Sequence, residues 1–289
     1  MNRPCIIEGQ FNPVLWLYWE NLPGRDEPYT HIRLCRKIIK SVCGDMDIHL
    51  VTPENLPDYL PDIHPNIHKI TLVNGDDSPC LAIKTGFIRV LLLAKYGGIY
   101  LDSDAIPLRS LSFVIEDIKR YGFICMRRTS APKKHISIGF LGARPNNIII
   151  QKYAADLRKR LAQSFQYRWG EIGAWVLTPL VNEYLNQCYI YQEEDVHPIV
   201  AEKQKCFVSK SLDPKDVLRP STFIFMLYHN IFTGPMAACE EMGYPNMKEG
   251  WLLDWSEEKL MHSDVLLSKI FRLAVAVAAD SIKSKALRP

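Results

Sequence analysis

Two aspartates separated by one serine are the side chains best suited to chemistry in this 289-residue chain. Asp102 and Asp104 follow the short apolar run Ile99-Tyr100-Leu101. Two carboxylates at a strand end can hold a divalent cation, and oxygen ligands suit Mg²⁺ or Mn²⁺ better than zinc. Such a cation can bridge two phosphate groups and neutralise charge as a nucleoside diphosphate departs. The pair therefore predicts a metal and diphosphate site.

The segment before these aspartates predicts how they are positioned. From about Pro79 to Tyr96 the residues are apolar nearly all round a helix, which is typical of a buried helix. Gly97-Gly98 ends it, because glycine adopts the left-handed conformation that a helix C-terminus needs. The next strand delivers the aspartates at its C-terminal end, where the ligands of open α/β sheets bind.

The other predicted elements give an α/β protein. Strands and helices alternate in the first hundred residues, which favours a sheet with helices on both faces. No linker or repeat divides the chain, so we expect one domain over residues 1–289. The predicted strands are Val14–Trp19, Asp47–Thr52, Gly122–Met126, Ile136–Leu141, Val196–Val200 and Phe223–Tyr228. The other predicted helices are Tyr29–Cys43, Asn146–Phe165, Ala174–Gln187 and one that starts at Glu257.

Composition excludes several classes of protein. With 47% hydrophobic and 23% charged residues, the chain has an ordinary globular composition. A net charge of +3 without a dense basic stripe predicts no nucleic-acid partner. The eight cysteines form no CxxC pair, so we expect reduced and mostly buried thiols. Without a signal-like start or a membrane-length apolar run, we expect a soluble cytoplasmic protein, or one that works beside a membrane.

The order of these elements resembles a known enzyme family. The unbroken series of apolar helix, Tyr-Gly-Gly, short strand and Asp-Ser-Asp over Phe87–Asp104 is similar to the glycosyltransferases that carry a DXD motif. These include the capsular polysaccharide synthesis and mannosyltransferase-like groups and, more distantly, the clostridial glucosylating toxins. Leu15–Trp19 looks like the family's opening strand, and Pro28–Leu60 keeps its next elements. The likeness covers about residues 13–112.

The resemblance implies a GT-A fold, with a mixed central sheet flanked by helices. It implies a nucleotide-sugar donor, expected to be a UDP-sugar, with Mn²⁺ or Mg²⁺ as the metal and a glycan or other hydroxyl acceptor. Residues 13–112 would then bind the donor, about 113–256 would form the acceptor side, and 257–289 would be a C-terminal helix. The oligomeric state is not predicted.

Several residues match family positions for the donor and metal. By resemblance, Asp104 is the direct metal ligand, and Asp102 contacts the ribose or sugar hydroxyls and the metal's water shell. Arg89 approaches the donor, or forms an internal ion pair. Trp16 stacks on the donor base, with a core position as the alternative. The remaining expected donor-binding residues are Tyr18, Thr85, Tyr100 and Ser103.

One departure from the family pattern concerns the donor. Thr85 and Gly86 stand where the family has a serine and an aspartate. This changes how the donor ribose or sugar is held. It also keeps open the alternative of a catalytically inactive module that binds a nucleotide sugar.

The C-terminal half offers further candidates. His229 after an apolar strand is expected to complete the metal site, with His262 as second choice, although a lone histidine is often structural. Glu171 or Asp254 would be the general base if the reaction inverts the anomeric centre, and both are equally compatible with solvated carboxylates. The final helix is basic and could contact an anionic membrane, although lysines facing water are the expected case. Its cations are Lys259, Lys269, Arg272, Lys283, Lys285 and Arg288.

A phosphatase of the haloacid dehalogenase type is the nearest enzyme alternative, because it also places Asp-x-Asp after an apolar strand. Here Ala105-Ile106-Pro107 follows the aspartates, where that class has a threonine or valine. The second acidic cluster, Gly44–Asp47, lies upstream, whereas that class has it downstream. The sequence therefore favours the glycosyltransferase.

Overall fold

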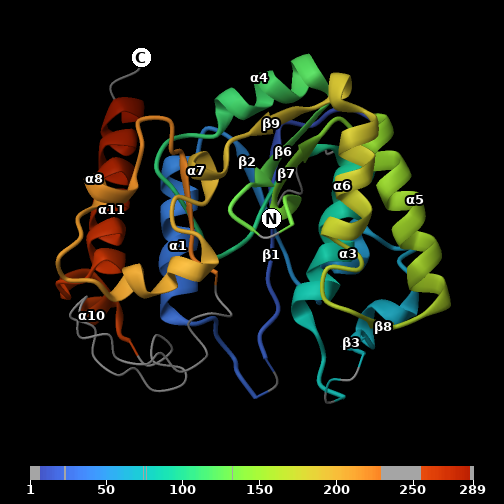
Figure 1. Cartoon of the computed structure of the whole chain (residues 1–289), viewed down its shortest axis with the longest axis horizontal. Helices are drawn as coiled ribbons and strands as arrows, with labels where there is room; N and C mark the ends of the chain where they lie inside the picture. The colour runs from blue at the N-terminus through green and yellow to red at the C-terminus, as the bar shows by residue number, and fades with distance from the viewer. Residues whose placement is uncertain are drawn as a thin grey trace. The chain divides into compact units, whose positions relative to one another are not determined.

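The computed structural model describes residues 7–22, 24–73, 75, 77–131, 133–228 and 255–286. The chain forms two compact units. The first contains the residues up to Glu20 together with Met46–Asp102 and Ser112–Gln192, and the second contains Asn21–Asp45, Ser103–Leu111 and the residues from Glu193 onward. Figure 1 labels many of the elements of both units.

A six-stranded sheet forms the centre of the first unit. Its order is β2 (Asp47–Val51), β1 (Val14–Tyr18), β4 (Gly98–Leu101), β7 (His135–Ala143), β6 (Phe123–Arg128) and β9 (Tyr189–Tyr191). Neighbouring strands are parallel except in the two pairs that involve β7. The predicted mixed central sheet is therefore confirmed.

The register of the sheet brings the ends of β1 and β4 to one edge. Leu15 pairs with Ile99 and Trp16 pairs with Tyr100 in the parallel β1–β4 ladder. Because parallel strands end at the same edge, the residues that follow Tyr18 and Leu101 leave the sheet together. Asp102 is the first residue after β4, so it lies at this edge, as the sequence predicts.

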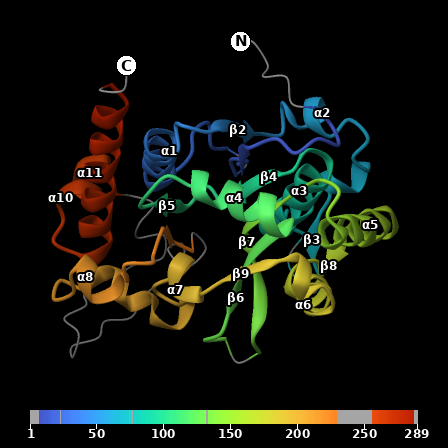
Figure 2. The same ribbon diagram turned by 90° about the horizontal axis from the view of Figure 1, so that it is seen from above.

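Helices cover both faces of this sheet. α3 (Leu81–Tyr96), α5 (Ile148–Gln163) and α6 (Ala174–Glu183) pack beside one another, as Figures 1 and 2 show. Their apolar cluster includes Leu141 and Ala143 of β7. The residue between these two, Gly142, instead faces α4 (Ser112–Tyr121), since a Cβ there would lie 2.5 Å from Ile118. α4 therefore covers the opposite face.

Smaller elements complete the first unit. The α2 helix (Leu56–Tyr59) and a 3₁₀ turn, η1 (Pro65–His68), follow β2. Strand β3 (Thr71–Leu72) pairs in parallel with β8 (Gln166–Tyr167), which lies between α5 and α6. A second 3₁₀ turn, η2 (Leu185–Gln187), follows α6.

Buried α3 ends as its sequence predicts. Gly97 and Gly98 have φ values of 70° and 96°, in the region that favours glycine. A Cβ at Gly98 would lie only 2.6 Å from the backbone carbonyl oxygen of Val14. The Gly-Gly pair therefore allows both the reversal after α3 and the close approach of β4 to β1.

The second unit is mainly helical. Strand β5 (Ala105–Pro107) pairs antiparallel with β10 (Ile224–Met226). α1 (Thr30–Val42) packs on β5 and on α11 (Leu266–Ala286), which also contacts α10 (Glu257–His262). The remaining elements are α7 (Glu193–Val196), η3 (Ala201–Val208) and α8 (Pro214–Val217).

Two predictions of secondary structure are wrong. The expected strand Val196–Val200 does not form, because Val196 ends α7, whose first turn holds three acidic residues, and Pro198 has no backbone N–H to give a ladder. The single C-terminal helix is interrupted between His262 and Leu266, so it forms α10 and α11.

Within the described ranges, no helix is long and apolar enough to cross a membrane. The described cysteines Cys35, Cys43, Cys80, Cys125, Cys188 and Cys206 form no disulfide bond, in agreement with the predicted reduced thiols.

Candidate functional site

Asp102 is fixed at the end of β4 by both its backbone and its side chain. Its N–H donates to the carbonyl oxygen of Gly139 on β7 at 3.0 Å. Its carboxylate Oδ1 lies 2.7 Å from Nη2 of Arg89 on α3. The Asp102 side chain is 29% exposed, whereas that of Arg89 is 5% exposed. The carboxylate is thus held by a buried cation while it keeps access to solvent.

Arg89 carries a charge on an otherwise apolar helix, and the surrounding groups satisfy it. Nη1 donates to the carbonyl oxygen of Ile138, and Nε donates to that of Thr85 at 3.4 Å. The guanidinium carbon lies 4.7 Å from the centroid of the Tyr100 ring. An Arg bound by a carboxylate, carbonyls and an aromatic face is stable in a buried position, where a lone charge is not. The predicted internal ion pair is therefore present, with Asp102 as the partner.

A second buried cation on α3 lies near the same sheet edge and was not predicted from the sequence. Lys84 is 7% exposed in its side chain, and its Nζ lies 2.6 Å from Oε2 of Glu20, which follows β1. The Tyr18 hydroxyl donates to the same carboxylate at 2.7 Å. Burial, and then this carboxylate, raise the pKa of the Tyr18 phenol well above its usual range. A lysine among apolar helix residues was the available signal, as for Arg89.

Asp104 belongs to the second unit, where it precedes β5. Its backbone carbonyl accepts a hydrogen bond of 3.3 Å from the N–H of Leu227. Ser103, the residue between the two aspartates, is buried. Burial, and then the negative charge of Asp104, raise the pKa of the Cys35 thiol in α1. The roles of Asp104 and Ser103 toward a metal and donor stay predictions.

Trp16 is fully buried. Its indole Nε1 donates to the carbonyl oxygen of Gly97 at 2.8 Å. The ring packs against His49 and Tyr96, with centroid distances of 5.1 Å and 5.6 Å. This packing favours the core alternative, because no face of the ring is open to a base. Trp19, which follows β1, is half-buried.

Packing explains the departure at Gly86. A Cβ at this position would overlap Cδ1 of Ile172, a residue of the loop before α6, and would lie 3.6 Å from Cδ1 of Ile138. The family's aspartate would therefore be forced into apolar side chains here. Thr85, beside it, is half-buried.

The remaining predicted candidates lie elsewhere or outside the described residues. Glu171 is engaged structurally: its Oε2 accepts from the N–H of Arg168 at 2.8 Å, and its Oε1 lies 3.5 Å from Arg160. His262 is exposed on α10, where its Nδ1 lies 2.9 Å from the Glu258 carbonyl oxygen. Asp254 and His229 are outside the described residues.

The predicted metal site has two carboxylates to offer, those of Asp102 and Asp104. No group of three or more His, Cys, Asp or Glu side chains is arranged as a metal cluster within the described residues. Mg²⁺ and similar hard cations commonly bind through one or two carboxylates, with substrate phosphates and water as the other ligands. Carboxylate oxygens are ligands that suit Mg²⁺ or Mn²⁺, and a metal held by these two aspartates stays a prediction.

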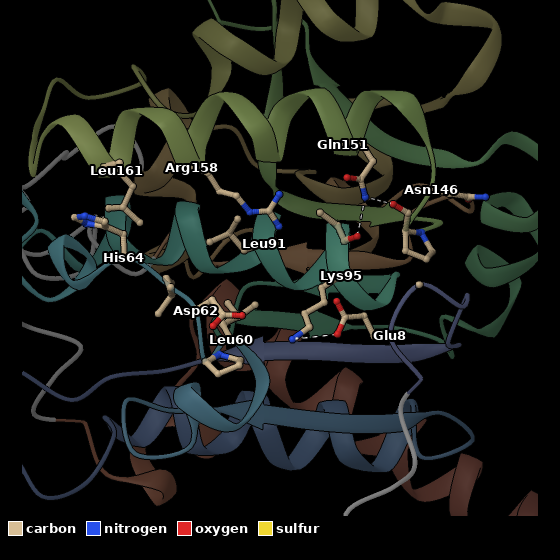
Figure 3. A pocket seen from close by; sticks show the side chains of 16 residues that line it. Glu8, Leu60, Asp62, His64, Leu91, Lys95, Asn146, Gln151, Arg158 and Leu161 are labelled. Carbon is tan, nitrogen blue, oxygen red and sulfur yellow. Dashed lines mark hydrogen bonds and ion pairs between the residues drawn. The ribbon is translucent and has the colours of Figure 1, made fainter.

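A cavity of about 750 Å³ lies elsewhere in the first unit. Figure 3 shows it between α5 and the loop around Leu60, with Arg158 and Lys95 directed into it. Asp62 and Glu8 give it acidic groups, and Lys95 lies 3.4 Å from Glu8. None of the predicted site residues lines this cavity.

The fold and site define a mixed α/β protein with an acidic pair after a central strand. A family model described as capsular polysaccharide synthesis protein matches residues 7–229. The chain therefore belongs to this family. The predicted resemblance is confirmed, and with it the assignment of the chain as a glycosyltransferase. No curated protein matches the chain by sequence.

Several solved structures are similar to this chain at low identity. The apo-form glycosyltransferase GlyE of Streptococcus pneumoniae is 13% identical, with a TM-score of 0.47 over 96% of this chain and 65% of that one. Mouse xyloside xylosyltransferase 1 is 10% identical, with a TM-score of 0.45 over 76% and 98%. The galactosyltransferase LgtC, in complex with donor and acceptor sugar analogs, is 12% identical, with a TM-score of 0.41 over 92% and 95%.

Proposed function

We propose that the protein is a metal-dependent glycosyltransferase that moves a sugar from a nucleotide diphosphate sugar, expected to be a UDP-sugar, to a glycan or other hydroxyl acceptor. One observation carries the proposal: Asp102 sits at the C-terminal end of β4, ion-paired at 2.7 Å with buried Arg89 and still in reach of solvent. Membership of a polysaccharide synthesis family supports the same activity.

Each residue has a distinct part in this proposal. Asp102 and Asp104 would hold Mn²⁺ or Mg²⁺, which when bound neutralises charge on the departing diphosphate. Arg89 fixes the orientation of the Asp102 carboxylate, and its positive charge favours an anionic ligand at this edge. Glu171 and Asp254 remain the candidate bases. The ties of Glu171 to Arg160 and Arg168 favour a structural role for it.

The proposed place of action is the cytoplasm, with or without peripheral membrane contact. Of the six cations proposed for membrane contact, the side chains of Lys259, Lys269 and Arg272 are among those the structure describes, and Lys259 lies 4.7 Å from the centroid of the Trp255 ring. Lys269 pairs with Asp213 at 3.1 Å, and Arg272 donates to the carbonyl oxygen of Met261 at 2.7 Å. These bonds favour the packed helix over the membrane-binding one.

Thermal unfolding with a panel of nucleotide sugars, with and without Mn²⁺, tests the proposal. We expect one donor to raise the melting temperature in a metal-dependent way and to be hydrolysed slowly. Asp104→Ala should abolish both donor hydrolysis and transfer while the melting temperature without ligand changes little. An active Asp104→Ala enzyme would refute the assignment.

A catalytically inactive binding module is the second candidate, and it is raised by Gly86, which stands where the family has an aspartate. The side chain that the family places on α3 is missing, and Ile172 fills the space. Metal-dependent donor binding without hydrolysis or transfer would identify this case. Absence of any response to nucleotide sugars would contradict both candidates.

A further inference from the structure

Two tryptophans at the start of α6 are unusually exposed. Trp169 is 63% exposed and Trp175 is 59% exposed, the highest values for large hydrophobic side chains within the described residues. Trp169 lies in the loop before α6, and Trp175 is the second residue of that helix, which Figure 1 shows beside α3 and α5. Large apolar side chains held in water often mark a binding surface.

The Trp175 ring rests on the loop and does not extend freely into solvent. A Cβ at Gly170 would lie 3.1 Å from Nε1 of Trp175 and 3.4 Å from Cε2, so the indole packs against this glycine. Gly170 has a φ of 84°, which favours glycine, and its carbonyl accepts from the N–H of Trp175 at 3.2 Å. Because Trp169 directly precedes Gly170, the two tryptophans flank one fixed point of the backbone.

Several hydrogen bonds hold the loop itself in place. The Glu171 carboxylate accepts from the N–H of Arg168 at 2.8 Å and pairs with Arg160. The hydroxyl of buried Tyr153 donates to the carbonyl oxygen of Ile172 at 2.6 Å. An aromatic side chain on a fixed loop loses little conformational entropy when it binds a ligand.

The same loop lies against the groups that hold Asp102. Ile172 packs on Gly86 of α3, and a Cβ at Gly173 would lie 3.1 Å from Ile138. The carbonyl of Ile138 accepts from Arg89, and Arg89 pairs with Asp102. Only Gly173 and Ala174 separate Ile172 from Trp175 along the chain, so the tryptophans belong to the loop that packs against the groups that hold Asp102.

We propose that Trp169 and Trp175 bind the acceptor glycan by stacking on its sugar rings, an inference that rests on the proposed function. One face of a pyranose ring carries mainly C–H groups, and an indole face covers these while the hydroxyls stay hydrated. The match to a capsular polysaccharide synthesis family makes a glycan the class of ligand that we assign to this surface.

The experiment compares Trp175→Ala and Trp169→Ala with Leu185→Ala. Leu185 is 55% exposed beyond the other end of α6, which makes it a control for a general apolar surface. Binding is measured on a printed array of bacterial polysaccharides and defined oligosaccharides, and donor hydrolysis in Mn²⁺ is measured in parallel. We expect Trp175→Ala to lose glycan binding about tenfold and Trp175→Phe to restore part of it. The rate of donor hydrolysis should be the same in the tryptophan variants as in the wild type. Leu185→Ala should bind glycan and hydrolyse the donor like the wild type.

Other outcomes overturn the inference. If the wild-type protein binds no glycan on the array, or if Trp175→Ala binds glycan like the wild type, glycan stacking on these tryptophans is excluded. If the wild type self-associates in light scattering and both Trp175→Ala and Leu185→Ala abolish this, the surface joins two copies of the chain. The wild type could also bind glycan through Trp175 and show no response to nucleotide sugars. This result would support glycan stacking and refute the proposed function.

Discussion

Replacing Asp102 by alanine tests whether the Arg89–Asp102 ion pair both holds the fold and orients the site. The change leaves a guanidinium that is 5% exposed without its carboxylate. Loss of a partner to a fully buried charge costs about 3–5 kcal/mol, whereas a hydrogen bond to a charged group contributes about 1.5–3 kcal/mol. Arg89 keeps its bonds to the carbonyls of Ile138 and Thr85, and Asp102 was 29% exposed. We therefore expect a loss of about 2 kcal/mol.

Thermal unfolding without metal or donor measures this loss. For a chain of this size, about 2 kcal/mol corresponds to a melting temperature lower by roughly 4 °C. Asp156→Ala is a matched control, because its pair with Arg160 is 2.6 Å long but about a third exposed on each side. Such a surface pair should contribute less than about 0.5 kcal/mol.

A double-mutant cycle with Arg89→Met separates the ion pair from other effects of the substitutions. Removing both charges should cost at least about 1 kcal/mol less than the sum of the single changes. Donor hydrolysis should be lost in Asp102→Ala and should not return in the double variant, because the carboxylate is still missing. The ion-pair argument would be refuted if Asp102→Ala had the same melting temperature as the Asp156→Ala control. It would also be refuted if the free-energy changes of the two single substitutions added up to that of the double variant.

Two further predictions concern packing and pH. Gly86→Ala should destabilise the protein by about 1–3 kcal/mol in thermal unfolding, because the new methyl group overlaps Ile172. Adding Ile172→Ala should recover part of this loss of stability. Equal stability of Gly86→Ala and the wild type would contradict the overlap. Burial, and then the neighbouring Cys188, raise the pKa of the Cys125 thiol in the folded protein. The stability that this protonated thiol contributes is therefore complete below the pKa of an unfolded thiol, about 8.5. Above that pH it decreases by about 1.4 kcal/mol per pH unit. Cys125→Ala should therefore flatten the fall in melting temperature between pH 8 and 10, and an unchanged slope would exclude this effect.

The local order around Asp102 could be predicted because each step has a strong sequence signal. The apolar helix α3, the Gly97-Gly98 reversal and the short strand β4 depend on interactions close in sequence. The partner of Arg89 could only be narrowed to a phosphate or a site aspartate. The choice of Asp102 depends on how α3 lies on the sheet, which a single sequence does not encode locally.

Burial of Trp16 shows what strand patterns leave open. All five residues of β1 are buried, because the strand lies between two neighbours with helices on the sheet faces. A strand buried on both faces has no polar alternation to show which side faces a ligand. The missed elements have other causes: α4 has a short apolar stripe of Val114, Ile115 and Ile118, and β5 and β9 are only three residues each.

Gly86 and the tryptophan loop are two parts of one packing arrangement. A site that had merely lost its aspartate would keep the space for a side chain, with water or a cavity beside the glycine. Here Ile172 fills that space, and the loop carrying it is fixed by Tyr153, Glu171 and the contact with Ile138. An aspartate at position 86 would bury an unpaired carboxylate against two isoleucines, at a cost of several kcal/mol. The departure from the family pattern therefore accompanies a loop packed onto α3, and this is more consistent with an altered sugar site than with a decayed one.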